Sequence, residues 1–69
     1  PSVSVINFND VSVMVRDNGP ADRETSIKAA LKLAKERCLA ISRTARLVSS
    51  HTGISDTYDR HEDHLFACE

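Results

Sequence analysis

The chain has 69 residues, of which 41% are hydrophobic and 28% charged, and its formal net charge is −1. This composition is typical of one folded domain and argues against a disordered chain. No uncharged stretch exceeds nine residues, and the one at residues 1–9 is far shorter than the roughly 20 apolar residues that a transmembrane helix needs. No secretory signal is recognisable either, so we expect a cytoplasmic protein without membrane contact.

Residues 3–16 are predicted to form a β-hairpin. Val11, Val13 and Val15 alternate with other side chains, and this period of two is typical of a half-buried strand. Residues 3–8 are β-branched in the same way and are expected to pair with it through a tight turn at Asn9 and Asp10. One long strand that pairs across a dimer axis is the alternative.

Residues 21–51 are predicted to form one long amphipathic, coiled-coil-like helix. Turn residues at 17–20 precede it, no Gly or Pro interrupts it, and Gly53 is expected to end it. Apolar residues recur at alternating steps of four and three, which is the pattern of a heptad seam. The seam consists of Ile27, Leu31, Ala34, Cys38, Ile41, Ala45 and Val48.

The apolar face of this helix is wider than a coiled coil requires. Ala30, Leu33, Ala40 and Leu47 extend it to about half of the helix circumference. A core of fewer than about 70 to 80 residues rarely supplies enough stability alone. We therefore predict a homodimer in which one edge of the face packs on the hairpin and the seam forms the dimer interface.

Residues 55–67 are predicted to form a short acidic helix. Ser55 is a suitable N-cap, and Ile54, Tyr58, His61 and Leu65 follow helical spacing. The predicted fold is thus a single α+β domain over residues 1–69, with a hairpin, one long helix and a short C-terminal helix.

Charge is unevenly distributed along the chain. Residues 25–50 carry six basic residues and one acidic residue, whereas residues 51–69 carry five acidic residues and one basic residue. Such faces are commonly just solvated, but they are also the candidate contacts with a protein or nucleic-acid partner. The basic candidates are Lys28, Lys32, Lys35, Arg43 and Arg46, and the acidic candidates are Asp59, Glu62 and Asp63.

His61, His64 and Cys68 are the candidate zinc ligands, with Cys38 or an acidic side chain available as a fourth. Their steps of three and four would place them on neighbouring parts of one helix face, but no standard zinc-site spacing accompanies them. We therefore expect no metal and no other cofactor. Two cysteines do not form a disulfide framework, so Cys38 is interpreted as a small buried hydrophobe, although a bridge to Cys68 is geometrically open.

Catalytic motifs are scarce. With two glycines the chain cannot build a Gly-rich phosphate loop. Pro1, next to a predicted strand over residues 2–8, is similar to the N-terminal proline that acts as general base in the tautomerase superfamily. The predicted C-terminal helix departs from the strand–helix–strand order of that family, and no counterpart of its substrate-binding arginines is evident. We therefore expect no enzyme, with a tautomerase-like enzyme as the second alternative.

The predicted function is that of a small regulatory or inhibitory homodimer that binds an unidentified macromolecule, with a protein favoured over nucleic acid. The first alternative is a DNA- or RNA-binding dimer that uses the basic face of the helix. A strand followed by two helices resembles the order of ribbon-helix-helix repressors, but Ser12, Met14 and Arg16 match the polar or basic reading face of their strand only in part.

Overall fold

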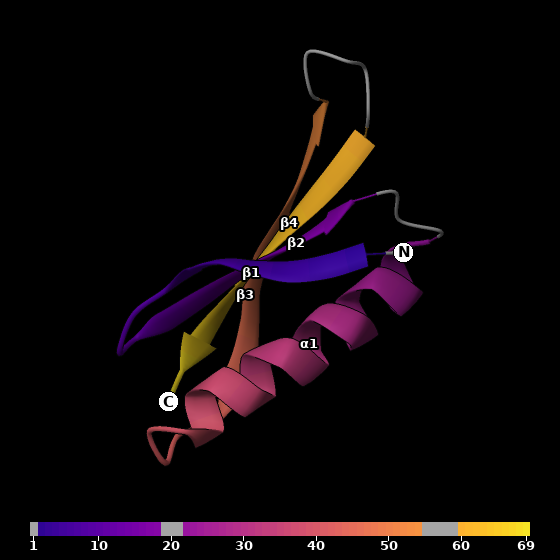
Figure 1. Cartoon of the computed structure of the whole chain (residues 1–69). Coiled ribbons are helices and arrows are strands. Elements are labelled where there is room, and N and C mark those ends of the chain that lie inside the picture. The colour runs from indigo at the N-terminus through magenta and orange to yellow at the C-terminus, as the bar shows by residue number, and fades with distance from the viewer. Residues whose placement is uncertain (1, 19–21, 55–59) are drawn as a thin grey trace.

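A computed structural model describes residues 2–18, 22–54 and 60–69 as a four-stranded antiparallel sheet with one helix packed on one face (Figure 1). The strand order is β1-β2-β4-β3, so β1 and β3 form the two edges. The elements are β1 (Ser2–Phe8), β2 (Ser12–Asn18), α1 (Arg23–Leu39), β3 (Ala45–Ile54) and β4 (Arg60–Cys68).

The N-terminal hairpin expected over residues 3–16 is present as β1 and β2. The side chain of Asn9 accepts hydrogen bonds from the backbone N–H groups of Val11 and Ser12 at 2.9 and 3.0 Å, which closes the turn. The two strands pair antiparallel from Ser2 opposite Asn18 to Phe8 opposite Val13, with a bulge between Val5 and Asn7. The alternative of one long strand is therefore wrong.

The helix predicted over residues 21–51 is shorter in the structure. It begins after Asp22, whose carboxylate accepts a hydrogen bond from the N–H of Thr25 at 2.7 Å, and it ends at Leu39. Ser42 then adopts a left-handed conformation with φ of 60°, and the N–H of Arg43 bonds back to the carbonyl of Cys38 at 2.9 Å. This turn reverses the chain into β3, so the predicted long helix is wrong beyond Leu39.

The short acidic helix predicted over residues 55–67 is also wrong. Residues 60–68 form β4, which lies between β2 and β3 and pairs antiparallel with both. Residues 55–59 lie outside the described residues. Within the described part of the chain, α1 is the only helix.

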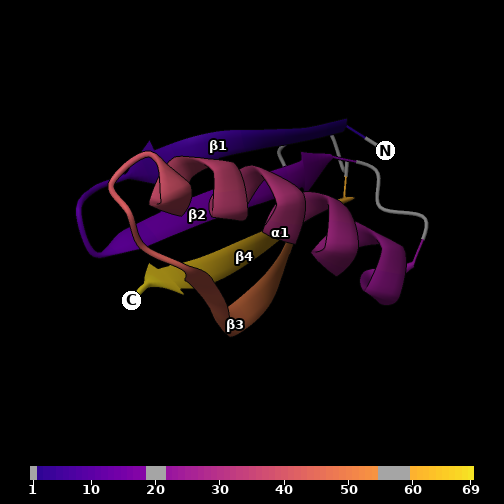
Figure 2. The ribbon, with the colours of Figure 1, turned by 90° about the horizontal axis from the view of Figure 1, so that it is seen from below.

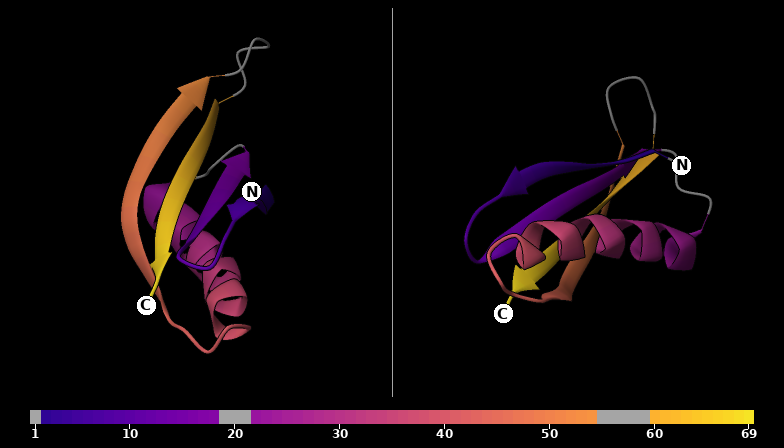
Figure 3. Two further views of the ribbon diagram at one scale, coloured as in Figure 1. Left: turned by 90° about the vertical axis from the view of Figure 1, so that its left-hand side faces the viewer. Right: turned by 60° about the horizontal axis from the view of Figure 1, so that its bottom comes forward.

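The molecule has two layers (Figures 2 and 3). Helix α1 lies across β2, with β1 and β4 on either side, and β3 reaches beyond the area that the helix covers. Among the residues that the structure describes, no element covers the opposite face of the sheet. Homodimerisation stays a prediction. No helix in the described residues is long and apolar enough to cross a bilayer.

The core between the layers changes in character along the helix. Ser26, Ala30, Ala34 and Cys38 are the buried helix positions, and they lie four residues apart. Beneath them three pairs of cross-strand neighbours point toward α1: Val13 with Phe66, Val15 with His64, and Asp17 with Glu62. The core is therefore apolar at the C-terminal end of α1 and polar at its N-terminal end.

A disulfide bond closes the apolar end of the core. Cys38 of α1 is bonded to Cys68 of β4, at a sequence separation of 30 residues, and both are buried. The prediction that Cys38 acts only as a small buried hydrophobe is wrong in this respect. Residue spacing could not reveal the bridge, because it depends on residues 60–68 forming a strand that ends beneath the last turn of α1.

Candidate functional site

Four polar side chains are buried together beneath the N-terminal half of α1. Asp17, Ser26, Glu62 and His64 come from β2, α1 and β4, and each is at most 1% exposed. A carboxylate close to the N-terminus of a helix is favoured by the unpaired N–H groups there.

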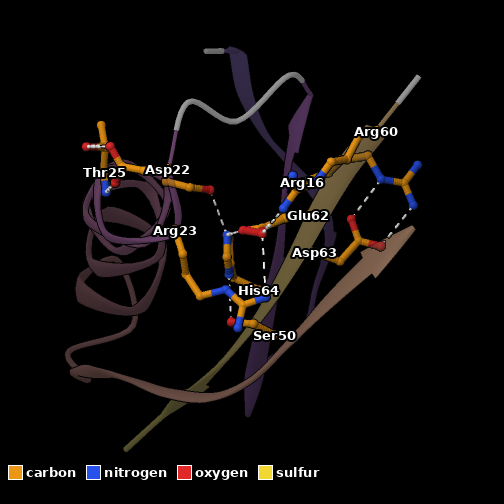
Figure 4. A network of polar contacts seen from close by, with 10 residues as sticks. Arg16, Asp22, Arg23, Thr25, Ser50, Arg60, Glu62, Asp63 and His64 are labelled. Carbon is orange, nitrogen blue, oxygen red and sulfur yellow. Dashed lines mark hydrogen bonds and ion pairs between the residues drawn. The ribbon is translucent and has the colours of Figure 1, made fainter. Parts of the chain in front are cut away.

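His64 is held between two serines (Figure 4). Its Nε2 lies 2.8 Å from the Oγ of Ser26, and its Nδ1 lies 2.8 Å from the Oγ of Ser50 on β3. Both ring nitrogens are therefore satisfied, as a fully buried histidine requires. The ring links α1, β4 and β3 through one side chain.

Glu62 meets two arginines at the surface of this cluster. Its Oε2 lies 3.6 Å from a guanidinium nitrogen of Arg23 and 3.5 Å from one of Arg60 (Figure 4). Among the described residues, the Oε1 of Glu62 and both carboxylate oxygens of Asp17 have no hydrogen-bond partner. Buried acceptors without donors are expensive, so this end of the core is less stable than the end with the disulfide.

The buried cluster is poorly arranged for catalysis. A serine beside a histidine and a carboxylate resembles a nucleophile with its base, yet Ser26 is 1% exposed and His64 is not exposed at all. A substrate would have to displace the first half of α1 to reach them. The geometry therefore favours a role in stability for these residues.

A surface groove lies at the other end of the molecule, between the last turn of α1 and the start of β3. It has a volume of about 210 Å³ and a mostly apolar wall. Leu39, which is 72% exposed, and Ala45 contribute apolar surface, whereas Lys35 and Arg43 contribute cations. Thr44 completes the lining, and its backbone is fixed by two hydrogen bonds to the backbone of Glu69 at 2.9 and 2.8 Å.

The basic residues predicted to contact a partner differ in their surroundings. Lys28 pairs with Glu24 at 3.2 Å, and Arg46 pairs with Glu69, whose pKa lies below its usual value because Arg46 donates a hydrogen bond to it. Arg43 donates a hydrogen bond to the carbonyl of Asp10 at 3.2 Å. Lys32 and Lys35 are exposed, and neither has a carboxylate partner among the described residues.

The acidic candidates are dispersed. Glu62 is buried in the polar cluster, whereas Asp63 lies on the open face of the sheet. There, Arg16 donates hydrogen bonds to both oxygens of Asp63, at 2.8 and 3.1 Å, and these bonds hold the pKa of the carboxyl below its usual value. Asp59 lies outside the described residues.

The residues predicted to form the dimer interface occupy three kinds of position. Ala34 and Cys38 are buried against the sheet, and Leu31, Ile41 and Ala45 are partly buried against the same core. Ile27 is half-buried on α1, whereas Val48 is 51% exposed on β3. The sheet of the same chain therefore covers most of the predicted seam.

The candidate zinc ligands are not brought together. On β4, His61 and His64 point to opposite faces of the sheet, and the sulfur of Cys68 is bonded to Cys38. Among the described residues, no group of three His, Cys, Asp or Glu side chains is placed to hold a metal ion. Pro1, the candidate general base, lies outside the described residues.

Comparison of the chain with protein-family models, with curated proteins and with solved structures finds no match. The class of the protein therefore follows from its described fold alone, which is an antiparallel four-stranded sheet covered by one helix.

Two of the predicted partner contacts, Lys35 and Arg43, line the groove, and so does Ala45, which the sequence predicts for the dimer interface. Leu39 and Thr44 complete the groove and are not among the predicted residues. Leu39 lies off the heptad seam and was assigned to the interior of a continuous helix, so its position at the last turn was hidden. The sequence also does not predict the polar residues Asp17, Ser26 and Ser50 of the buried cluster. The cluster is built from three strands and a helix, so its members are not related by any short, regular spacing in the sequence.

Proposed function

We propose that this chain is a small, non-enzymatic regulatory or inhibitory protein that binds another protein at the groove between α1 and β3 and works as a homodimer. The observation that carries the proposal is the combination of an apolar wall with Lys35 and Arg43 at one groove. Protein interfaces are often anchored by one large side chain in such a pocket, with charged groups around it that set orientation.

The chemistry of the groove defines the kind of partner segment. Its volume of about 210 Å³ is that of roughly seven water molecules, which suits one Leu or Phe side chain better than a whole ligand of drug size. The two cations favour carboxylates next to that anchor. We therefore expect an acidic segment with one large apolar residue.

Nucleic acid is a less suitable partner. Binding through phosphates needs several free cations along one track, and the affinity then falls steeply with salt. Two of the five candidate cations, Lys28 and Arg46, are already paired with carboxylates. The apolar wall of the groove would also be left without a contact by a phosphate backbone.

The absence of enzymatic activity is part of the proposal. The polar cluster around His64 is closed to substrate by α1, which supports a structural role. A tautomerase-like mechanism would depend on Pro1, and the antiparallel arrangement of all four strands departs from the strand–helix–parallel strand order of that superfamily.

The homodimer is supported by the small size of the chain and by the large apolar side chains that a single chain leaves exposed. They are Ile6, Phe8, Val11, Leu39, Leu47, Val48 and Ile54. The cytoplasmic location predicted from the sequence stays a prediction. The Cys38–Cys68 disulfide argues instead for an oxidising compartment, since reducing compartments keep most thiols free.

The groove is tested with a short fluorescein-labelled peptide that carries one Phe between glutamates. We expect saturable binding by fluorescence anisotropy, and binding should be lost when the Phe is replaced by Ala or the glutamates by lysines. Lys35→Glu combined with Arg43→Glu should weaken binding at least about tenfold, since opposed charges then repel the peptide.

Lys28→Glu is the matched control for the groove, because Lys28 lies on the same helix but does not line the groove. This variant should bind the peptide nearly as tightly as the wild type. Equal binding of the acidic and the basic peptide by the wild-type chain would overturn the assignment of the groove.

A further inference from the structure

Strand β3 is a long edge of the sheet that carries no Asp, Glu, Lys or Arg after Arg46. It comprises ten residues and pairs with β4 on one side only. Natural edge strands are usually protected by charged residues, by proline or by a bulge, because their unpaired backbone groups otherwise accept another strand. Here the bulge lies between Leu47 and Ser49, so residues 49–54 remain regular and unprotected.

The exposed apolar side chains of this edge are symmetric about its middle. Val48 lies three residues before His51 and Ile54 lies three residues after it. Val48 is 51% exposed and Ile54 is 69% exposed. Ile54 ends the regular stretch and Val48 adjoins its other end at the bulge, so an exposed apolar side chain flanks the uncharged middle of the strand on either side.

We infer that a second copy of this chain pairs with β3, antiparallel, about a twofold axis that passes through His51. In that register His51 faces its own copy, Ser50 faces Thr52 and Ser49 faces Gly53, and Val48, at the bulge, lies next to Ile54 of the other copy. The two sheets then form one continuous sheet of eight strands. This inference rests on the homodimer of the proposed function and gives it an interface.

Self-pairing suits this strand for two reasons. A twofold axis repeats each contact, so Val48 of each copy meets Ile54 of the other copy. Four exposed side chains are then covered in the dimer. The central positions are filled by Ser, Thr, His and Gly, and none of them brings like charges of Lys, Arg, Asp or Glu together across the axis.

The other edge, β1, is a less suitable surface. It has seven residues rather than ten, and its exposed apolar residues Ile6 and Phe8 are 43% and 40% exposed, less than Val48 and Ile54 of β3. Phe8 therefore provides a matched control, since it is an exposed apolar residue on an edge strand outside the inferred interface.

The oligomeric state is measured by light scattering behind size exclusion over a wide range of concentration. We expect a dimer for the wild-type chain, and we expect Val48→Lys and Ile54→Lys each to weaken it at least about tenfold. Phe8→Lys should leave the dimer intact. Circular dichroism spectra should be the same for all variants, because the three positions are exposed in the single chain.

Cross-linking tests the register independently. Opposed residues in an antiparallel pair have Cβ atoms about 4.5 to 5.5 Å apart, which is close to the separation that a disulfide spans. His51→Cys should therefore form a covalent dimer under mild oxidation. Ser49→Cys should not, since two copies of residue 49 would lie roughly 13 Å apart at a rise of 3.3 Å per residue.

The outcomes distinguish failure of the homodimer itself from failure of the β3 interface alone. A wild-type chain that is monomeric at every concentration would refute both the homodimer and its interface, without affecting the peptide test of the groove. A dimer that persists in Val48→Lys and Ile54→Lys, and in which His51→Cys fails to cross-link, would refute the β3 interface alone.

Discussion

Asp17 and Glu62 face each other across β2 and β4, on the side of the sheet that α1 covers, and both are removed from solvent. Among the described residues, three of their four carboxylate oxygens have no hydrogen-bond partner. Two acidic groups in direct opposition, with few donors around them, reduce the stability of the fold.

We therefore predict that Asp17→Asn stabilises the protein. The substitution keeps the shape of the side chain and removes an acidic group whose oxygens have no hydrogen-bond partner among the described residues, so the free energy of unfolding should rise by about 1 to 3 kcal/mol. Urea unfolding followed by circular dichroism measures the change. Asp10→Asn, at an exposed position, should have little effect; a loss of stability in Asp17→Asn would mean that the carboxylate has a stabilising partner.

The Cys38–Cys68 disulfide should supply a large part of the stability of so small a core. A bridge at a sequence separation of 30 residues restricts the unfolded chain, and this restriction is worth roughly 3 to 4 kcal/mol. We expect the urea midpoint to fall markedly in the presence of a reductant. Cys38→Ala combined with Cys68→Ala should show a similarly low midpoint and no further response to the reductant.

The pair of Arg16 and Asp63 should make stability depend on pH. The hydrogen bond from Arg16 lowers the pKa of Asp63 in the folded state. A lowered folded pKa contributes stability above the unfolded value of about 3.9, and this stability is lost as the pH falls through the folded pKa.

The melting temperature of Asp63→Asn should therefore be below that of the wild type at neutral pH, and the difference should shrink below about pH 4. Glu36→Gln is the control, since Glu36 is exposed and has no ion pair among the described residues. A difference that stays constant down to strongly acidic pH would show that the pair does not act through its charge.

The sequence predicted the first two strands because their local signals agree with their environment. Val13 and Val15 are buried and the residues between them are not, so the period of two is visible in hydrophobicity. The side chain of Asn9 closes the turn, as its residue type predicts. Helix α1 begins at Arg23, two residues after the predicted start, and Asp22 is its N-cap.

The end of α1 could not be predicted because nothing in the sequence interrupts the helical pattern there. The heptad spacing continues past the end of the helix by coincidence. Ile41 lies in the turn after α1, Ala45 starts β3, and Val48 lies at the bulge of β3. The break occurs at Ser42, which takes a left-handed conformation that glycine usually marks. Tertiary pairing with β4 overrides the local preference.

Strand β4 was missed for a different reason. Its alternate residues are buried as in any half-buried strand, but two of the buried positions hold Glu62 and His64. Burial along β4 therefore alternates with a period of two, but the hydrophobicity of its sequence does not show that period. Of the residues that line the groove, the sequence predicted only the cations Lys35 and Arg43 as partner contacts. The shape of the groove could not be predicted, because it depends on the turn after Leu39.

The change from an apolar to a polar core along α1 sets the order in which the fold opens. Amide groups near the disulfide, in the last turns of α1 and at the end of β4, should exchange with deuterium only on global unfolding. Amides in the first turns of α1 should exchange through smaller, local openings, because Asp17 and Glu62 hold the layers together weakly there. We therefore expect the helix to separate from the sheet at its N-terminal end first, while the groove at its other end keeps its shape.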